Sequence, residues 1–183
     1  MIVALLKAVD AIERVASAIV AVFMFAIMVI VFSDVVMRYA FNRPFSWAYD
    51  LIALYLMAGV FFLILSEAYA RNAHVSVDIL QQRFSPTMIR VTEIVTCLVG
   101  IVVFSLIGWL GLLRTIEAFN AGDVMAGAIP WPMWPSIGLV PFGAGLLTLR
   151  LVLHGLAHVA SLVTGRSLID LPASHATSTE TYE

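Results

Sequence analysis

Long apolar runs separated by clusters of charged residues dominate the pattern along the chain. A charge at the centre of a bilayer costs roughly 2.5 to 3.5 kcal/mol on insertion scales, so long runs without charges mark transmembrane helices. About 20 helical residues cross a hydrocarbon core about 30 Å thick. Four runs contain no Asp, Glu, Lys or Arg: 15–33, 51–66, 94–113 and 124–149. They predict four transmembrane helices, spanning about residues 15–36, 48–69, 92–114 and 135–157.

Composition agrees with this all-α membrane fold. Of the 183 residues, 62% are hydrophobic and 12% charged, and the mean hydropathy of +1.00 would force a soluble domain to expose large apolar patches. The first apolar run is too long for a signal peptide and has no clear cleavage site after it, so it is expected to remain as a helix. We expect one four-helix transmembrane domain over residues 1–166 and a disordered cytoplasmic tail over 167–183, because the tail is polar and aperiodic.

The connecting segments carry further signals. Apolar residues among polar ones in 75–84 predict a short amphipathic segment at the cytoplasmic interface. Pro86, preceded by Ser85, suits the first position of a helix, so the third helix is expected to begin there and to protrude from the bilayer. The fourth helix is expected only after Pro130, Pro132 and Pro135, because proline lacks the amide donor.

Basic residues predict the orientation, since they collect in cytoplasmic segments. One side of the membrane would carry Lys7, Arg14, Arg71, Arg83, Arg90, Arg150 and Arg166. The other side would carry only Arg38, Arg43 and Arg114. Both termini are therefore expected in the cytoplasm. The net charge of −2 offers no basic surface for nucleic acid, and the single cysteine, Cys97, excludes an internal disulfide.

The segment "MRYAFNRPFSWAYD", residues 37–50, separates the first two spans and holds most of the candidate site residues. Asp34 and Arg38 stand four positions apart and can pair across one helical turn, as can Glu67 and Arg71 in the second span. Such pairs either end helices and fix their depth among the membrane lipids, or dock a partner protein, because ionisable groups near lipid are usually paired across helices. The candidate charges and interfacial residues are Asp34, Arg38, Arg43, Trp47, Asp50, Glu67 and Arg71.

Chemical motifs are not apparent elsewhere. His154 and His158 lie on one helix near its cytoplasmic end, which favours interfacial anchoring over ligation of a metal or haem. The sequence shows no nucleophile and base constellation, glycine-rich phosphate loop or Cys/His metal spacing, so we expect no catalytic residue, cofactor or metal, and no enzyme activity. The helix cores contain no acid, which weakens an autonomous pump. Glycines at 100, 108, 111, 138, 143 and 145 predict close helix contacts with an unspecified partner.

Three motifs follow one another along the chain: "SDVVMRYAFNRPFSWAYDLIALYLMAGVFF", "EAYARNAHVSVDIL" and "IPWPMWPSIGLVPFGAGLLTLRL". In this order they resemble the small membrane subunit of tripartite ATP-independent periplasmic (TRAP) transporters, and the resemblance covers about residues 10–160. The first motif is similar to a family signature in which an aspartate and Arg-Tyr end the first helix and a Trp followed by an acid opens the second. Two positions depart from it: His74 is farther from Arg71 than in many relatives, and Asp50 stands where Glu is common.

The resemblance implies a subunit without transport chemistry of its own. In such sodium-coupled symporters a large membrane subunit holds the substrate and sodium sites and moves by an elevator motion, and a soluble periplasmic protein delivers an organic acid. The small permease subunit forms a heterodimer with the large one in the bacterial inner membrane, as a scaffold that helps to dock the binding protein. Two alternatives remain open at this point: a membrane anchor subunit of an oxidoreductase complex, and a small self-assembling transporter.

Overall fold

The structure is a computed structural model that describes residues 2–70, 86–127 and 129–164. Every regular element in this part of the chain is a helix, and four helices are long and apolar enough to cross a membrane. The predicted all-α fold with four candidate spans is therefore confirmed. The amphipathic segment expected at 75–84, Arg71 and the tail 167–183 lie outside the described residues.

The first helix, α1, runs from Ile2 to Phe41 and is much longer than its predicted span. Its 40 residues correspond to about 60 Å, roughly twice the thickness of the hydrocarbon core. The helix ends where Asn42 takes a left-handed conformation with φ 54°, which asparagine tolerates better than most residues. The N–H of Arg43 then donates to the carbonyl of Met37 at 3.2 Å.

The second span is one helical rod built from three elements: α2 (Ala48–Leu51), the π-helical turn η1 (Ile52–Leu56) and α3 (Met57–Ala70). A π turn widens the helix and is frequent at functional positions. Here it lies close to the loop that joins the third and fourth spans.

The third span, α5, begins at Pro86 as expected and ends at Ala121. Gly122 follows with φ +66°, and two backbone bonds close the helix: Gly122 N–H to Phe119 carbonyl at 3.3 Å, and Asp123 N–H to Ala118 carbonyl at 3.0 Å. This is a Schellman motif, in which glycine supplies the left-handed residue without a steric cost.

The fourth span, α6, runs from Trp134 to Thr164. It begins one residue before Pro135, so the expectation that it starts only after the third proline is wrong. Pro135 lies in the first turn, where its missing N–H has no helical partner to lose. Pro141 lies inside the helix, where the carbonyl of Ile137 lacks its usual donor.

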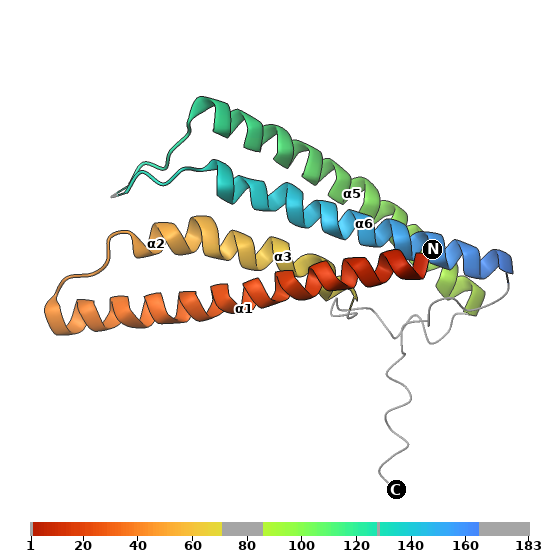
Figure 1. Ribbon diagram of the computed structural model, residues 1–183, viewed down its shortest axis with the longest axis horizontal. Helices are drawn as coiled ribbons and strands as arrows, with labels where there is room; N and C mark the ends of the chain where they lie inside the picture. Colours follow the sequence, from red (N-terminus) through yellow and green to blue (C-terminus); the bar gives the residue numbers. More distant parts are fainter. Residues whose placement is uncertain (1, 71–85, 128, 165–183) are drawn as a thin grey trace, which may run out of the picture.

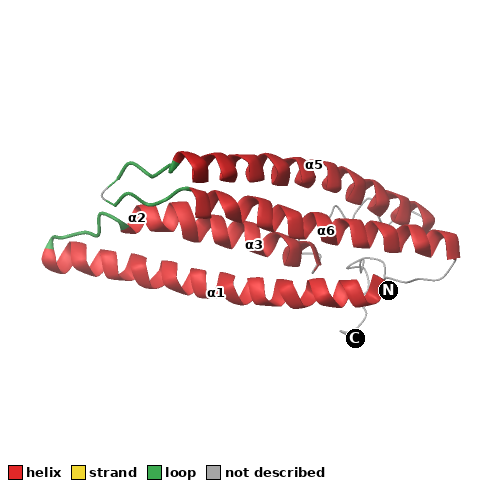
Figure 2. Cartoon of the chain, turned by 45° about the horizontal axis from the view of Figure 1, so that its top comes forward, coloured by secondary structure: helices red, strands yellow, loops and turns green. Residues whose placement is uncertain are grey.

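The helices lie side by side in the order α1, α3, α6, α5, which differs from their order in the sequence (Figures 1 and 2). The N-terminus and the C-terminal end of α6 lie at one end of the array, the terminal end. The connections 42–47 and 122–133 lie at the opposite end, the loop end. α6 occupies the middle and is the most enclosed: 44% of its most apolar stretch is buried, against 6% in α5. The two edge helices therefore expose most of their apolar surface.

Glycines explain how closely the neighbouring helices approach. A Cβ at Gly143 of α6 would collide with the backbone carbonyl of Phe62 in α3. A Cβ at Gly111 of α5 would lie 3.0 Å from Val140 Cγ1 of α6. Gly100, Gly108 and Gly138 also lie against residues of the neighbouring helix, so five of the six predicted glycines are used within the chain, whereas a Cβ at Gly145 would meet open space.

Candidate functional site

A buried group of charged and polar side chains joins three helices near the terminal end. Arg150 of α6 donates through Nη1 to Asp10 Oδ1 at 2.9 Å and also to Glu13 Oε2, both on α1. The hydroxyl of Ser66 on α3 donates to the other oxygen of Glu13. We call these four residues the arginine cluster.

Burial makes this pairing necessary. The side chain of Glu13 is 4% exposed and that of Arg150 is 9% exposed. A buried charge without a partner is strongly destabilising, so removing Arg150 would leave Glu13 uncompensated, and removing Glu13 would leave Arg150 with only the half-exposed Asp10. The arginine cluster therefore stabilises the contact between α1, α3 and α6 when all its members are present, and the loss of one charged member would destabilise that contact.

A polar cavity of about 240 Å³ lies beside the arginine cluster. It is lined by Asp10, Glu13, Arg14, Glu67 and Ala70. The predicted candidate Glu67 is thus at the terminal end, next to charges that sequence reasoning did not select. Its expected pair with Arg71 lies outside the described residues.

A second group of polar residues lies at the loop end, around Asp34. The expected pair is present: Arg38 Nη2 lies 2.9 Å from Asp34 Oδ2. The other oxygen of Asp34 accepts a bond from the backbone N–H of Phe45 at 2.6 Å. The carboxylate is 15% exposed and the guanidinium side chain 59%, so Asp34 supports the loop from inside while Arg38 faces outward.

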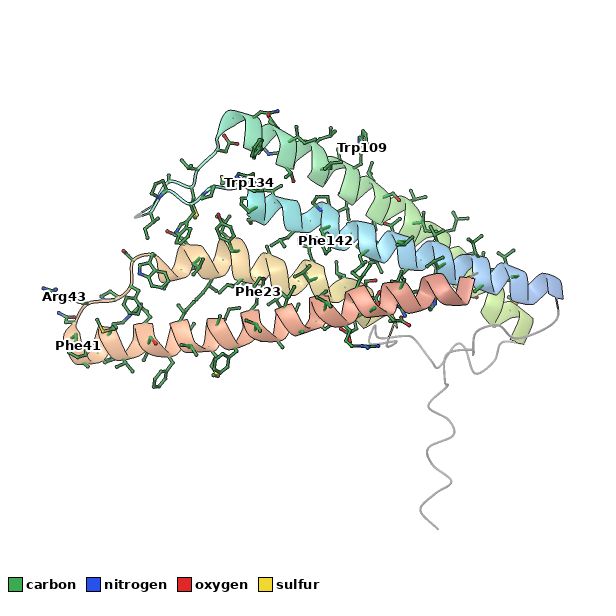
Figure 3. The ribbon with its side chains drawn as sticks, in the orientation of Figure 1. Phe23, Phe41, Arg43, Trp109, Trp134 and Phe142 are labelled. Atoms are coloured by element: carbon green, nitrogen blue, oxygen red, sulfur yellow. The ribbon has the colours of Figure 1, made fainter. Side chains whose placement is uncertain are left out.

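The remaining candidates at the loop end, Trp47, Asp50 and Arg43, form few contacts with the rest of the described chain. Trp47 stacks on Phe45, with ring centroids 5.4 Å apart. Asp50 lies against Gly127, where a Cβ would come within 2.7 Å of its carboxylate oxygen Oδ2. Arg43 projects from the loop (Figure 3), and within the described part of the chain neither it nor Asp50 forms an ion pair.

The loop 122–133 is fastened to the π turn. The hydroxyl of Tyr55 donates to the carbonyl of Pro132, and the ring of Tyr55 packs edge-on against Trp131 at 5.9 Å. The hydroxyl of Ser136 donates to the carbonyl of Leu54. The loop itself is held by a bridge between Val124 and Pro132. These contacts hold the described parts of the connection, 122–127 and 129–133, against the second span.

The distance between the two polar groups matches a membrane. Along α1, Glu13 and Asp34 are about 32 Å apart at 1.5 Å per residue. A hydrocarbon core is about 30 Å thick. The two carboxylates therefore suit its two borders, with apolar helix surface between them.

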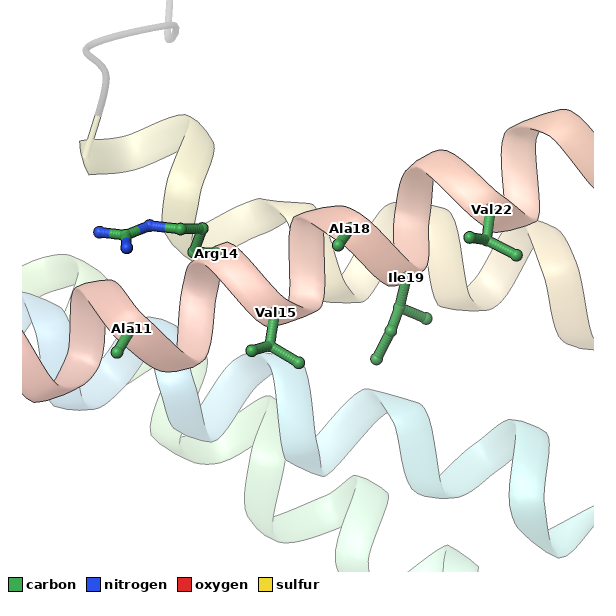
Figure 4. A pocket seen from close by; sticks show the side chains of 6 residues that line it. All are labelled: Ala11, Arg14, Val15, Ala18, Ile19 and Val22. Atoms are coloured by element: carbon green, nitrogen blue, oxygen red, sulfur yellow. The ribbon is translucent and has the colours of Figure 1, made fainter.

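Apolar grooves run along this surface. One cavity of about 590 Å³ follows α1 and is lined by Ala11, Arg14, Val15, Ala18, Ile19 and Val22. In Figure 4, Val15 and Ile19 point from α1 toward α6, whereas Arg14 points away from them. A second cavity, of about 500 Å³, lies between α5 and α6 beside Trp109 and Gly145. These surfaces suit lipid chains or apolar helices.

His154 is engaged in packing rather than facing a cavity. Its ring lies edge-on to Tyr69, with centroids 5.6 Å apart. The hydroxyl of Tyr69 is in turn 3.3 Å from the sulfur of Cys97. The side chain of His158 lies outside the described residues. Within the described part of the chain, no three His, Cys, Asp or Glu side chains are placed to hold a metal ion.

Sequence reasoning missed Glu13, Ser66 and Arg150 because it used charges only to mark the ends of spans. A usable signal existed on α1. Glu13 lies on the same stripe as Val9, Ala16 and Val20, which are all buried. This spacing of three and four residues defines one helix face, so it places the carboxylate inside the array.

Comparison with protein families matches residues 27–161 to the family described as "Tripartite ATP-independent periplasmic transporters, DctQ component". This range contains the loop-end residues and the three helices that follow them. Comparisons with curated proteins and with solved structures gave no match.

Proposed function

The chain belongs to the DctQ component family of tripartite ATP-independent periplasmic transporters, and from this we propose that it is a scaffold in a sodium-coupled importer of an organic acid. The family makes it the small permease subunit of such a transporter, a multi-pass protein of the bacterial inner membrane. In the proposed mechanism a large permease moves the substrate and the sodium ions, and this subunit supports the large permease.

The distribution of charge carries the proposal. Asp10, Glu13 and Arg150 pair with one another near one membrane border, and Asp34 and Arg38 pair near the other. The apolar runs between these borders contain no Asp, Glu, Lys, Arg or His, and a path for ions or carboxylates needs such groups or exposed backbone. A static role fits this pattern better than a moving one.

The arrangement of the helices supports a heteromeric complex. α1 and α5 form the two edges of the array and expose most of their apolar surface. A large permease seated against this surface would enlarge the static part of the complex, and lipids would cover the rest.

The loop end is the proposed contact with a periplasmic binding protein. Arg38 and Arg43 are exposed there, beside Tyr39 at 85% exposure and Tyr49 at 76%. Arginine and aromatic side chains are enriched where proteins bind each other tightly. This assignment places the loop end in the periplasm and both termini in the cytoplasm, in line with the excess of basic residues at the terminal end.

Reconstitution tests the proposal. The chain, the large permease and the binding protein would be purified and placed in liposomes, alone and together, under an inward sodium gradient with a panel of radiolabelled organic acids. Uptake is expected only when all three proteins are present. Sodium-driven uptake by this chain alone would contradict the scaffold role. Full uptake by the large permease and the binding protein in the absence of this chain would also contradict it.

A further inference from the structure

The aliphatic contacts of α1 with its neighbours do little to fix its position along and around its own axis. Ala16 and Val20 of α1 pack with Leu63 of α3, and Phe23 lies against Gly59. In lipid, such contacts gain little from the removal of water and depend on van der Waals packing. The aliphatic side chains could pack almost as well after a shift of one helical turn, whereas the ring of Phe23 fills the space that Gly59 leaves and so also favours the observed register.

The arginine cluster, in contrast, admits one arrangement. Both carboxylate oxygens of Glu13 are used, one by Ser66 on α3 and the other by Arg150 on α6. Arg150 also reaches Asp10, three positions earlier on α1. A shift of α1 by one turn, about 5.4 Å, would separate Glu13 from both partners. In one direction it would also carry Asp10 away from Arg150 and leave the buried charges unpaired, and in the other it would put Asp10, whose side chain is one methylene shorter, in the place of Glu13.

The polar bonds of α1 at the loop end do not join it to α3 or α6. The polar contacts of Asp34 go to Arg38 on the same helix and to Phe45 in the loop that follows it. Those bonds would move together with α1 and would not resist its sliding past α3 or α6.

We propose that the arginine cluster sets the register of α1, fixing both its depth and its rotation against α3 and α6. The register determines where α1 presents Asp34, Arg38 and the loop 42–47. This role is independent of the proposed scaffold function, because it concerns the fold of this chain alone. Buried ion pairs often contribute less to stability than apolar residues of similar size, while they discriminate between alternative packings.

Distance measurement between spin labels tests the register directly. The full chain would carry Cys97→Ser, with labels at Phe32→Cys on α1 and Phe61→Cys on α3, in lipid nanodiscs. Phe23 lies level with Gly59 and the two helices are antiparallel, so these labels are about 16 Å apart along the helix axes and a slide of α1 changes their separation by nearly its full length. Both labelled positions are exposed, at 69% and 59%. The parent protein is expected to give one narrow distance distribution.

Arg150→Lys is the central variant. Lysine keeps the positive charge but has one compact ammonium group on a flexible stem, without the fixed fork of arginine. We expect a second distance population, displaced by about 5 Å, or one helical turn. Arg14→Lys is the matched control: it makes the same change next to Glu13, at an exposed residue that forms no ion pair with the described side chains, and should leave the distribution unchanged.

Two more variants separate register from stability. Glu13→Met with Arg150→Met replaces the ion pair by apolar side chains and is expected to insert normally while showing several distances. Ser66→Ala removes only one hydroxyl and should broaden the distribution slightly, which keeps the experiment decisive if the arginine variants fail to insert. A single narrow parental distribution in every variant that inserts would overturn the proposal.

Discussion

Asp34 holds the chain that follows α1 by accepting a hydrogen bond from the backbone N–H of Phe45 at 2.6 Å, eleven residues later. The bond is charge-assisted, so it contributes about 1.5 to 3 kcal/mol where it forms. Asp34→Ala should therefore loosen the loop 42–47 without preventing membrane insertion. Hydrogen exchange of the amides in 43–47 should accelerate at least about tenfold. Arg38→Gln, which removes only the exposed ion pair, should leave this exchange nearly unchanged.

Charge reversal at the loop end should impair transport by the assembled system. Arg38→Glu or Asp50→Arg would place a like charge against any complementary partner surface, which costs several kcal/mol. We expect uptake at least about tenfold lower, with normal amounts of the subunit in the membrane by immunoblot. Uptake equal to wild type from both variants would remove these two residues from the proposed partner surface.

Gly143 and Gly145 form a matched pair on α6. At Gly143 an added methyl group meets the carbonyl of Phe62, so Gly143→Ala should destabilise the α3 and α6 contact by about 1 to 3 kcal/mol. At Gly145 the added methyl meets nothing within 4 Å, so Gly145→Ala should be neutral or stabilise by up to about 1 kcal/mol. Thermal unfolding in detergent measures both. Equal effects would show that the approach at Gly143 is looser than described.

The bond from Tyr55 to the carbonyl of Pro132 should fix the loop 122–133. Tyr55→Phe removes only the hydroxyl and should cost about 1 kcal/mol locally. Hydrogen exchange in 124–127 and 129–132 should rise about fivefold, while the four helices remain protected. Tyr49→Phe is the control, because that side chain is exposed and forms no hydrogen bond among the described residues.

Cys97 should be inert in the native membrane. It is 1% exposed, between Leu147 and Leu151 of α6. A maleimide dye should therefore label it only when α5 separates from α6, so labelling should follow the loss of helix structure on heating. Rapid labelling of the folded protein would contradict the packing of α5 on α6.

The number of candidate spans could be predicted from the sequence because charges are excluded from a hydrocarbon core whatever the tertiary structure. Pro86 and the pair of Asp34 with Arg38 were also predictable, since both depend on local geometry within one helix. These features need no knowledge of which helices are neighbours.

The neighbours themselves could not be predicted in this way. Helices exposed to lipid are apolar on most sides, so their sequence lacks the polar face that orients a helix in a soluble protein. The glycines predicted close helix contacts, but only the structure shows that Gly143 packs against α3 and Gly111 against α6. Arg150 was counted as a cytoplasmic charge because its partners on α1 lie far away in the sequence.

The position of α6 between α3 and α5 bears on how the protein is made. α6 is the last of the four helices to leave the ribosome, yet α5 packs chiefly on it. α1 and α3 can pair early, whereas α5 must wait in the bilayer until synthesis is almost complete. Arg150 also arrives with α6, so Glu13 meets its counter-charge only at that stage. Assembly of the subunit is therefore a late event that depends on completion of its final helix.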